Sequence, residues 1–123
     1  MNDSAATPAL SFPKARRLTR PAEFLQVKTD GHAHRGALLI LGVLPQEESG
    51  FRAGFVTSKR VGGAVVRNRV RRRLRDIVRR HQHALHDGVW IVLVARPAAA
   101  GATSRQLEDE WFRLAKRAQI LRF

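Results

Sequence analysis

The segment from residue 59 to residue 80 combines a strong helical pattern with a strong charge bias. Its apolar residues are Val66, Val70, Leu74, Ile77 and Val78, at offsets of 4, 8, 11 and 12 that fit the helical period. On a helix these side chains lie within a sector of about 120°. The pattern predicts an amphipathic helix from Ala64 onward whose apolar stripe covers a core and whose remaining faces are cationic.

The charge on this predicted helix is almost entirely of one sign. Residues 59–80 contain ten Lys and Arg residues and one acid, Asp76. Arginines four positions apart destabilise a helix by roughly 0.2–0.5 kcal/mol per pair. Such pairs occur here at Arg67/Arg71, Arg69/Arg73, Arg71/Arg75 and Arg75/Arg79. A helix selected only for solubility would interleave acids, so we expect a polyanion to bind this surface.

Composition leaves three classes of anionic partner open. The chain has 23 Lys and Arg residues against 10 acidic ones, a net charge of +13, so nucleic acid, an anionic membrane and an acidic protein are all candidates. A membrane-surface helix needs a large exposed apolar face, whereas this apolar stripe is needed to cover a sheet. Arginine favours bidentate phosphate contacts and stacking on bases. RNA is therefore the predicted partner. No helix-turn-helix pattern points to a DNA-binding protein. Phosphate contacts alone do not distinguish RNA from DNA.

The rest of the chain predicts one α+β domain over residues 18–123, preceded by a flexible basic arm over residues 1–17. A short helix begins at Thr19 or Arg20 and stops at Gly31. Residues 36–44 and 51–57 are β-like runs that we expect to pair as an antiparallel hairpin, with an extra short strand near His32. Asp87 and Gly88 are expected to end the basic helix, and a strand is predicted over residues 89–95. The order strand, helix, strand predicts that the strands over residues 51–57 and 89–95 are parallel and joined by the basic helix.

A last helix is predicted after a loop over residues 97–101. Thr103 and Gln106 have the spacing of a capping box. Its buried stripe is predicted to comprise Leu107, Trp111, Leu114, Ala118 and Leu121.

No arrangement of side chains predicts an active site within the protein. Glu108, Asp109 and Glu110 are consecutive on a helix and therefore diverge, which favours a solvated edge over a metal site. The histidine pairs lack a third metal ligand, and His81, His83 and His86 suit the negative pole of a helix. We predict no catalytic residue and no protein-bound metal or other cofactor.

The strand-to-helix region carries a recognisable motif. Ser58-Lys59-Arg60-Val61-Gly62, followed by Ala64-Val65-Val66-Arg67-Asn68-Arg69-Val70-Arg71-Arg72, resembles the signature of the bacterial ribonuclease P protein subunit. The Arg-Asn-Arg core is its most specific part. Supporting matches are Arg17-Leu18, Phe24, Arg52, Gly54 and Ala95-Arg96-Pro97, so the resemblance covers most of the chain.

The resemblance implies a two-layer αβββαβα sandwich, ribosomal-protein-like, with a left-handed βαβ crossover formed by the basic helix. Periodicity alone would favour a right-handed one. It also implies a protein cofactor that binds a catalytic RNA and precursor tRNA, so that the 5′ leader is removed by a ribonucleoprotein endonuclease. Mg²⁺ would be required by the holoenzyme and bound through RNA, and no membrane or obligate protein partner is expected.

Two sets of binding residues follow from the resemblance. The set expected to contact the catalytic RNA is Lys59, Arg60, Arg67, Asn68, Arg69, Arg71, Arg72 and Arg75. The set expected to line a cleft for the single-stranded leader is Phe24, Lys28, Leu38, Ile40 and Val56. Lys28 and Ile40 stand where the family has aromatic residues, which predicts more charge and apolar contact and less base stacking in this cleft.

The alternative is a general structural RNA-binding protein of the ribosomal type. Residues 1–13 lack the basic and apolar regions of a signal peptide, and no apolar run approaches the ~20 residues of a membrane span. The sequence therefore predicts a cytoplasmic protein.

Overall fold

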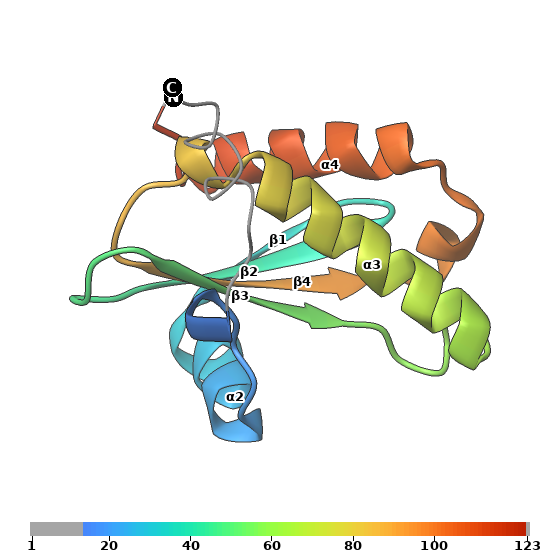
Figure 1. Cartoon of the computed structure of the whole chain (residues 1–123), viewed down its shortest axis with the longest axis horizontal. Helices are drawn as coiled ribbons and strands as arrows, with labels where there is room; N and C mark the ends of the chain where they lie inside the picture. The colour runs from blue at the N-terminus through green and yellow to red at the C-terminus, as the bar shows by residue number, and fades with distance from the viewer. Residues whose placement is uncertain (1–13, 123) are drawn as a thin grey trace, which may run out of the picture.

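The computed structural model describes residues 14–122, which form a four-stranded sheet with helices on both faces (Figure 1). In chain order the elements are η2 (Lys14–Arg16), α2 (Pro21–Asp30), β1 (His32–Arg35), β2 (Leu39–Pro45), β3 (Phe51–Val56), α3 (Ala64–Arg80), η3 (Gln82–Ala84), β4 (Val89–Ala95), η4 (Pro97–Gly101) and α4 (Ser104–Arg117), where η marks a short 3-10 helix. The predicted α+β class and the extra strand at His32 are confirmed.

The strands lie in the order β1-β2-β4-β3. β2 is antiparallel to β1 and to β4, while β3 is parallel to β4. The predicted hairpin between residues 36–44 and 51–57 is therefore wrong, because β4 lies between β2 and β3. All seven residues of β4 are apolar and five are buried: the central position pairs both edges of this strand and buries the face that packs on the larger core.

α3 connects the parallel strands β3 and β4, as predicted. In Figure 1 β3 runs from left to right, α3 returns above the sheet, and β4 runs to the right again behind β3. The crossover is therefore left-handed, as the family resemblance implied and against the usual preference for right-handed connections.

Two apolar clusters hold the layers together. α3 and α4 pack on one face of the sheet over the larger core, which includes Val70, Leu74 and Trp111. α2 covers part of the opposite face over a smaller cluster of Leu18, Val27, Leu44 and Val92. The opposite face is only partly covered, which leaves room for a cleft beside α2.

The helix ends agree in part with the prediction. α2 has Arg20 at its N-cap and Gly31 at its C-cap, and the Thr103–Gln106 capping box opens α4. α3 ends at Arg80, earlier than the expected Asp87, because His81 leaves the helical conformation and η3 follows. Within residues 14–122 no helix is long and apolar enough to cross a membrane.

Glu110 is buried, so its predicted place on a solvated edge is wrong. The residue is 3% exposed, and its Oε2 accepts hydrogen bonds from the N–H groups of Leu38 at 2.6 Å and Leu39 at 2.7 Å. A buried carboxylate is tolerated where it accepts such backbone bonds. Glu110 therefore ties α4 to the start of β2.

The chain before α2 contacts the edge strand β3. Arg17 forms a parallel bridge with Ala53, and the Leu18 N–H donates to the Ala53 carbonyl at 2.9 Å. Contacts thus begin before residue 18, the predicted start of the domain. Most of the predicted flexible arm, residues 1–13, lies outside the described residues.

Candidate nucleic-acid interface

α3 displays its cations because the core takes up its apolar stripe. Val70, Leu74, Ile77 and Val78 are at most 1% exposed, which fixes the rotation of the helix about its axis. At the turn before the helix Gly62 has a φ of 152°, a conformation that suits glycine. The remaining faces of α3 therefore carry the arginines predicted from the sequence.

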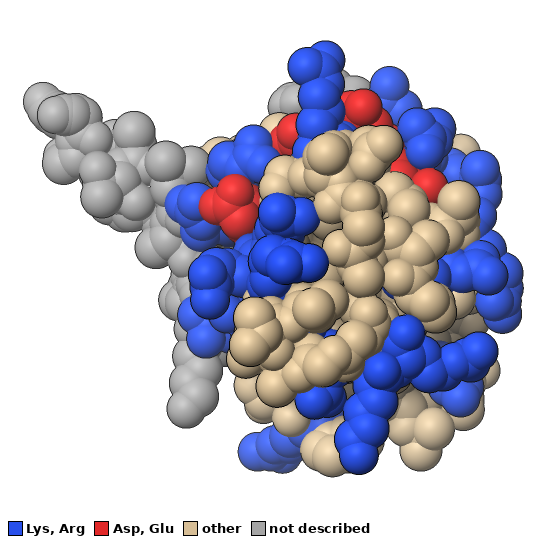
Figure 2. Space-filling model, turned by 90° about the vertical axis from the view of Figure 1, so that its right-hand side faces the viewer, with Lys and Arg blue, Asp and Glu red and all other residues tan. Residues whose placement is uncertain are grey.

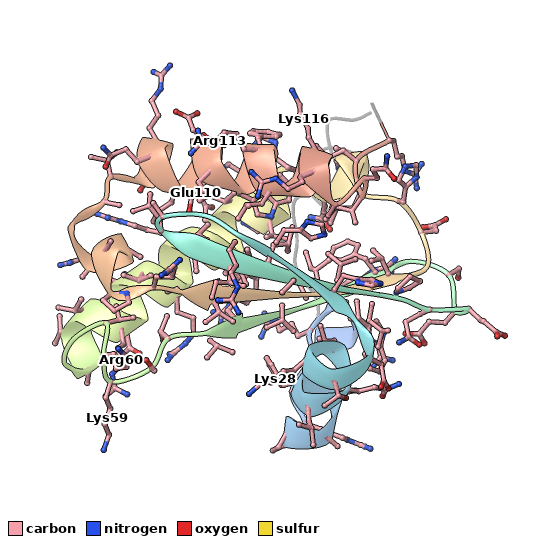
Figure 3. All side chains as sticks on the ribbon, turned by 180° about the vertical axis from the view of Figure 1, so that it is seen from behind. Lys28, Lys59, Arg60, Glu110, Arg113 and Lys116 are labelled. Carbon is pink, nitrogen blue, oxygen red and sulfur yellow. The ribbon has the colours of Figure 1, made fainter. Side chains whose placement is uncertain are left out.

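One group of these cations is without an acidic partner. Among the described residues no carboxylate forms an ion pair with Lys59, Arg60, Arg67 or Arg72. Lys59 and Arg60 point away from the fold in the loop before α3 (Figure 3). Figure 2 views the molecule from the right-hand side of Figure 1, where α3 begins. On this face Lys and Arg side chains surround an uncharged centre, and few acids lie among them. This group is available to bind phosphate.

A second group of arginines is engaged by the fold itself. Arg69 and Arg73 donate to the carbonyls of Ala100 at 3.2 Å and Ala102 at 2.9 Å, which anchors α3 to η4 and the residue after it. Arg71 donates to Thr57 Oγ1 at 2.7 Å and to Asn68 Oδ1 at 2.9 Å. These bonds hold the guanidinium groups in place, and each group has further N–H donors.

Arg75 lies in a small cationic pocket of about 200 Å³ between α3, β3 and the chain before α2. Arg17 and Arg71 line the same pocket, and the Arg75 guanidinium lies 6.0 Å from the centre of the Phe55 ring. Burial, followed by repulsion from Arg17 and Arg71, lowers the pKa of Arg75 from its usual value. An anion placed here would relieve the repulsion among the three charges.

The acids of this region gather at the far end of α3. Asp76 pairs with Arg79 and Arg80, and Glu108 on α4 pairs with Arg80 and His81. A hydrogen bond from His81 and the nearby Arg80 lower the pKa of Glu108. The cations without an acidic partner therefore lie in the first half of α3 and in the loop before it.

A separate, mainly apolar cleft of about 540 Å³ lies between α2 and the sheet. It is lined by Phe24, Leu25, Val27, Lys28, His32, Ala33, Arg35, Ile40, Gly42, Val56, Val92 and Val94. Phe24 forms one wall because Gly54 lies beneath it: a Cβ at Gly54 would stand 2.4 Å from Phe24 Cε1. The structure thus brings together four of the five residues predicted for the leader cleft, namely Phe24, Lys28, Ile40 and Val56.

The fifth predicted cleft residue, Leu38, is not part of the cleft. Leu38 packs against the larger core on the other face of the sheet and lines a hollow beside α4. Strand alternation would place the side chains of Leu38 and Ile40 on the same face of the sheet, but β2 begins only at Leu39. Because Glu110 binds the N–H groups of residues 38 and 39, the chain bends here and the alternation does not extend back to Leu38.

Comparison with known proteins identifies the family. The family model described as Ribonuclease P matches residues 12–119. The chain belongs to the ribonuclease P family. The Ribonuclease P protein component of Chloroflexus aurantiacus is 41% identical over 109 residues, covering 88% of this chain and 81% of the relative. That of Roseiflexus castenholzii is 38% identical and covers 88% of this chain and 89% of the relative.

Solved structures agree with the family assignment. The Staphylococcus aureus RNase P protein is 27% identical, with a TM-score of 0.82 over 88% of this chain and 99% of that one. The RNase P protein from Thermotoga maritima shares the fold, with a TM-score of 0.75 over 82% of this chain at 23% identity. Membership of the ribonuclease P family links the chain to tRNA processing as part of a ribonucleoprotein.

The sequence analysis did not identify Arg35, which lines the cleft from β1. No motif or spacing in the sequence indicated a binding role for this residue. Arg96, from the Ala95-Arg96-Pro97 match, donates from Nη1 to the Gly36 carbonyl at 2.9 Å and is not part of the cleft lining. Within residues 14–122 no three His, Asp or Glu side chains lie close enough together to hold a metal ion.

Proposed function

We propose that this protein is the protein cofactor of ribonuclease P, which binds the catalytic RNA through α3 and its preceding loop. The observation that carries the proposal is the group of cations without an acidic partner, Lys59, Arg60, Arg67 and Arg72, on α3 and its preceding loop in a ribonuclease P family member. Neutralising RNA phosphates with such groups releases counterions and offsets the repulsion between two polyanions. Asn68, Arg69, Arg71 and Arg75 complete the proposed surface.

The cleft beside α2 is proposed to hold the 5′ leader of precursor tRNA. A single strand suits this cleft because Phe24 offers an aromatic face, Ile40 and Val56 offer apolar contact, and Lys28 and Arg35 offer charge at its edge. The cleft and the surface of α3 lie on different elements, so both can be occupied at once. The protein would thereby position the leader relative to the catalytic RNA.

In this proposal cleavage chemistry belongs to the RNA, and the Mg²⁺ ions that support it are held mainly by RNA groups. The protein supplies no catalytic residue: its contribution is affinity for the precursor and tolerance of low Mg²⁺. We propose the cytoplasm as the place where it acts.

The test is reconstitution. RNA-free protein is added to the cognate catalytic RNA and precursor tRNA at low Mg²⁺, and 5′ cleavage and precursor affinity are measured. We expect both to increase, and we expect the protein alone to cleave nothing. If the protein increases neither cleavage nor precursor affinity over the RNA alone and co-sediments with ribosomes, the ribosomal-type alternative is supported. Cleavage by the protein alone would show that it is itself a nuclease.

A further inference from the structure

α4 carries a second group of cations far from the RNA-binding face of α3. Arg113, Lys116 and Arg117 are exposed along the last two turns of the helix, and the Arg113 side chain is 64% exposed. Lys116 projects outward from α4 (Figure 3), while the Arg113 guanidinium lies beside Glu110. These three residues, which we call the α4 cations, have no place in the binding surfaces proposed above.

The α4 cations are connected to the cleft across the edge of the sheet. Arg117 Nη1 donates to the Arg35 carbonyl at 3.2 Å, and the Arg35 side chain lines the cleft. β1, which carries Arg35, is an edge strand. A chain that leaves the cleft past Arg35 therefore meets no further strand and reaches the α4 cations directly.

Of the α4 cations, Arg113 pairs with an acid, whereas among the described residues no carboxylate forms an ion pair with Lys116 or Arg117. Glu110 contacts Arg113 at 3.3 Å, but its other oxygen is bound to the two backbone N–H groups at the start of β2. Arg113 and Arg117 stand four residues apart, a spacing at which like charges destabilise a helix. α4 also carries the acids Glu108, Asp109 and Glu110, and the α4 cations lie in the turns that follow them.

Within the described part of the chain, the α4 cations have no exposed aromatic ring beside them on which a base could stack. The nearest aromatic residue on the helix, Phe112, packs inward with its ring centre 5.2 Å from that of Trp111. A surface of Lys and Arg without an exposed aromatic binds phosphates regardless of base identity, whereas stacking on aromatic rings requires an accessible ring face.

We propose that Arg113, Lys116 and Arg117 bind backbone phosphates of the 5′ leader beyond the segment held in the cleft. This inference rests on the proposed function of the cleft and extends it to long leaders. The contact is independent of sequence and sensitive to salt, so it adds affinity for any precursor whose leader is long enough to pass Arg35.

The experiment compares two precursors that differ only in leader length. One leader ends inside the cleft and the other continues past it, and affinity for the reconstituted holoenzyme is measured over a range of salt. The test variant is Arg113→Gln/Lys116→Gln/Arg117→Gln, and Arg105→Gln is the matched control on the same helix. Since Arg117 also contacts the Arg35 backbone, Lys116→Gln alone is measured too, and thermal unfolding checks each fold.

The wild type and the control should bind the long-leader precursor more tightly than the short one. The triple variant should lose that gain, with a salt slope lower by about two for the long leader only, and Lys116→Gln should lose part of it. An equal loss for both precursors, or no loss for either, would overturn the inference. Failure of the proposed function is seen separately, as a wild-type protein that does not promote cleavage of the short-leader precursor.

Discussion

At the scale of single residues, the cations of α3 differ in what their head groups contact. Arg72 is exposed and unpaired, whereas the neighbouring Arg73 donates to the Ala102 carbonyl at 2.9 Å. Adjacent arginines on one helix therefore have different roles. Arg72 is left to bind RNA in the proposed function, whereas Arg73 fastens α3 to the segment before α4.

Substituting these two neighbours separates the roles. Arg72→Ala should lower the salt slope of RNA binding by about one and change the free energy of unfolding by less than about 0.5 kcal/mol. Arg73→Ala should instead destabilise the fold by about 1–2 kcal/mol. Binding titrations at several salt concentrations and urea denaturation measure the two effects; equal losses of stability would show that the distinction is incorrect.

Glu110 gives a second prediction at this scale. Glu110→Ala leaves the buried N–H of Leu39 and the half-buried N–H of Leu38 without an acceptor and should destabilise the protein by about 3 kcal/mol. Glu110→Gln retains an acceptor and should cost about 1 kcal/mol. Urea denaturation of both variants provides the measurement. Asp109→Ala is the control, because this neighbouring acid is exposed and should be close to neutral.

At the scale of elements, Glu108 in the first half of α4 joins this helix to the end of α3. Its pKa is lowered by the hydrogen bond from His81 and by Arg80, so the ionised carboxylate is more stable in the folded protein than in the unfolded chain. This contribution is complete above the ordinary carboxyl pKa of 4.5 and is lost as the pH falls through the lowered value.

Glu108→Gln should therefore reduce stability at neutral pH and leave it nearly unchanged in acid. Thermal unfolding of wild type and variant between pH 3 and 7 measures the difference, which should shrink as the pH falls. A difference that is constant with pH would contradict the assigned role of the carboxylate.

α2 gives the second prediction at this scale, since it contributes one wall of the cleft. Phe24→Ala should remove most of the affinity that a leader adds and leave binding to the catalytic RNA alone intact. Binding of precursor and mature tRNA to the reconstituted holoenzyme measures the leader's contribution. A uniform loss for both ligands would instead indicate that α2 is needed only for folding.

The elements also show what was predictable from the sequence. The α3 stripe from Val70 to Val78, the Thr103 capping box and the β4 strand follow from local periodicity and were confirmed. The position of β4 between β2 and β3 depends on contacts between distant segments, so the hairpin prediction failed. Leu38 was misplaced for the same reason, because Glu110, 72 residues further along the chain, bends the backbone there.

At the scale of the whole molecule, the layers separate two kinds of surface. The unpaired cations surround the start of α3 on one side of the sheet, and the apolar cleft lies on the other side beside α2. One rigid sheet therefore fixes the distance between the proposed catalytic-RNA surface and the proposed leader site. This arrangement suits a protein that aligns two RNAs.

The central claim is that the unpaired cations at the start of α3 bind the catalytic RNA, and its most direct test is the salt dependence of that binding. The variant Lys59→Gln/Arg60→Gln/Arg67→Gln/Arg72→Gln is compared with wild type over a range of salt. The predicted result is a native fold and a log–log slope lower by about three to four. An unchanged slope in the folded variant would contradict the account.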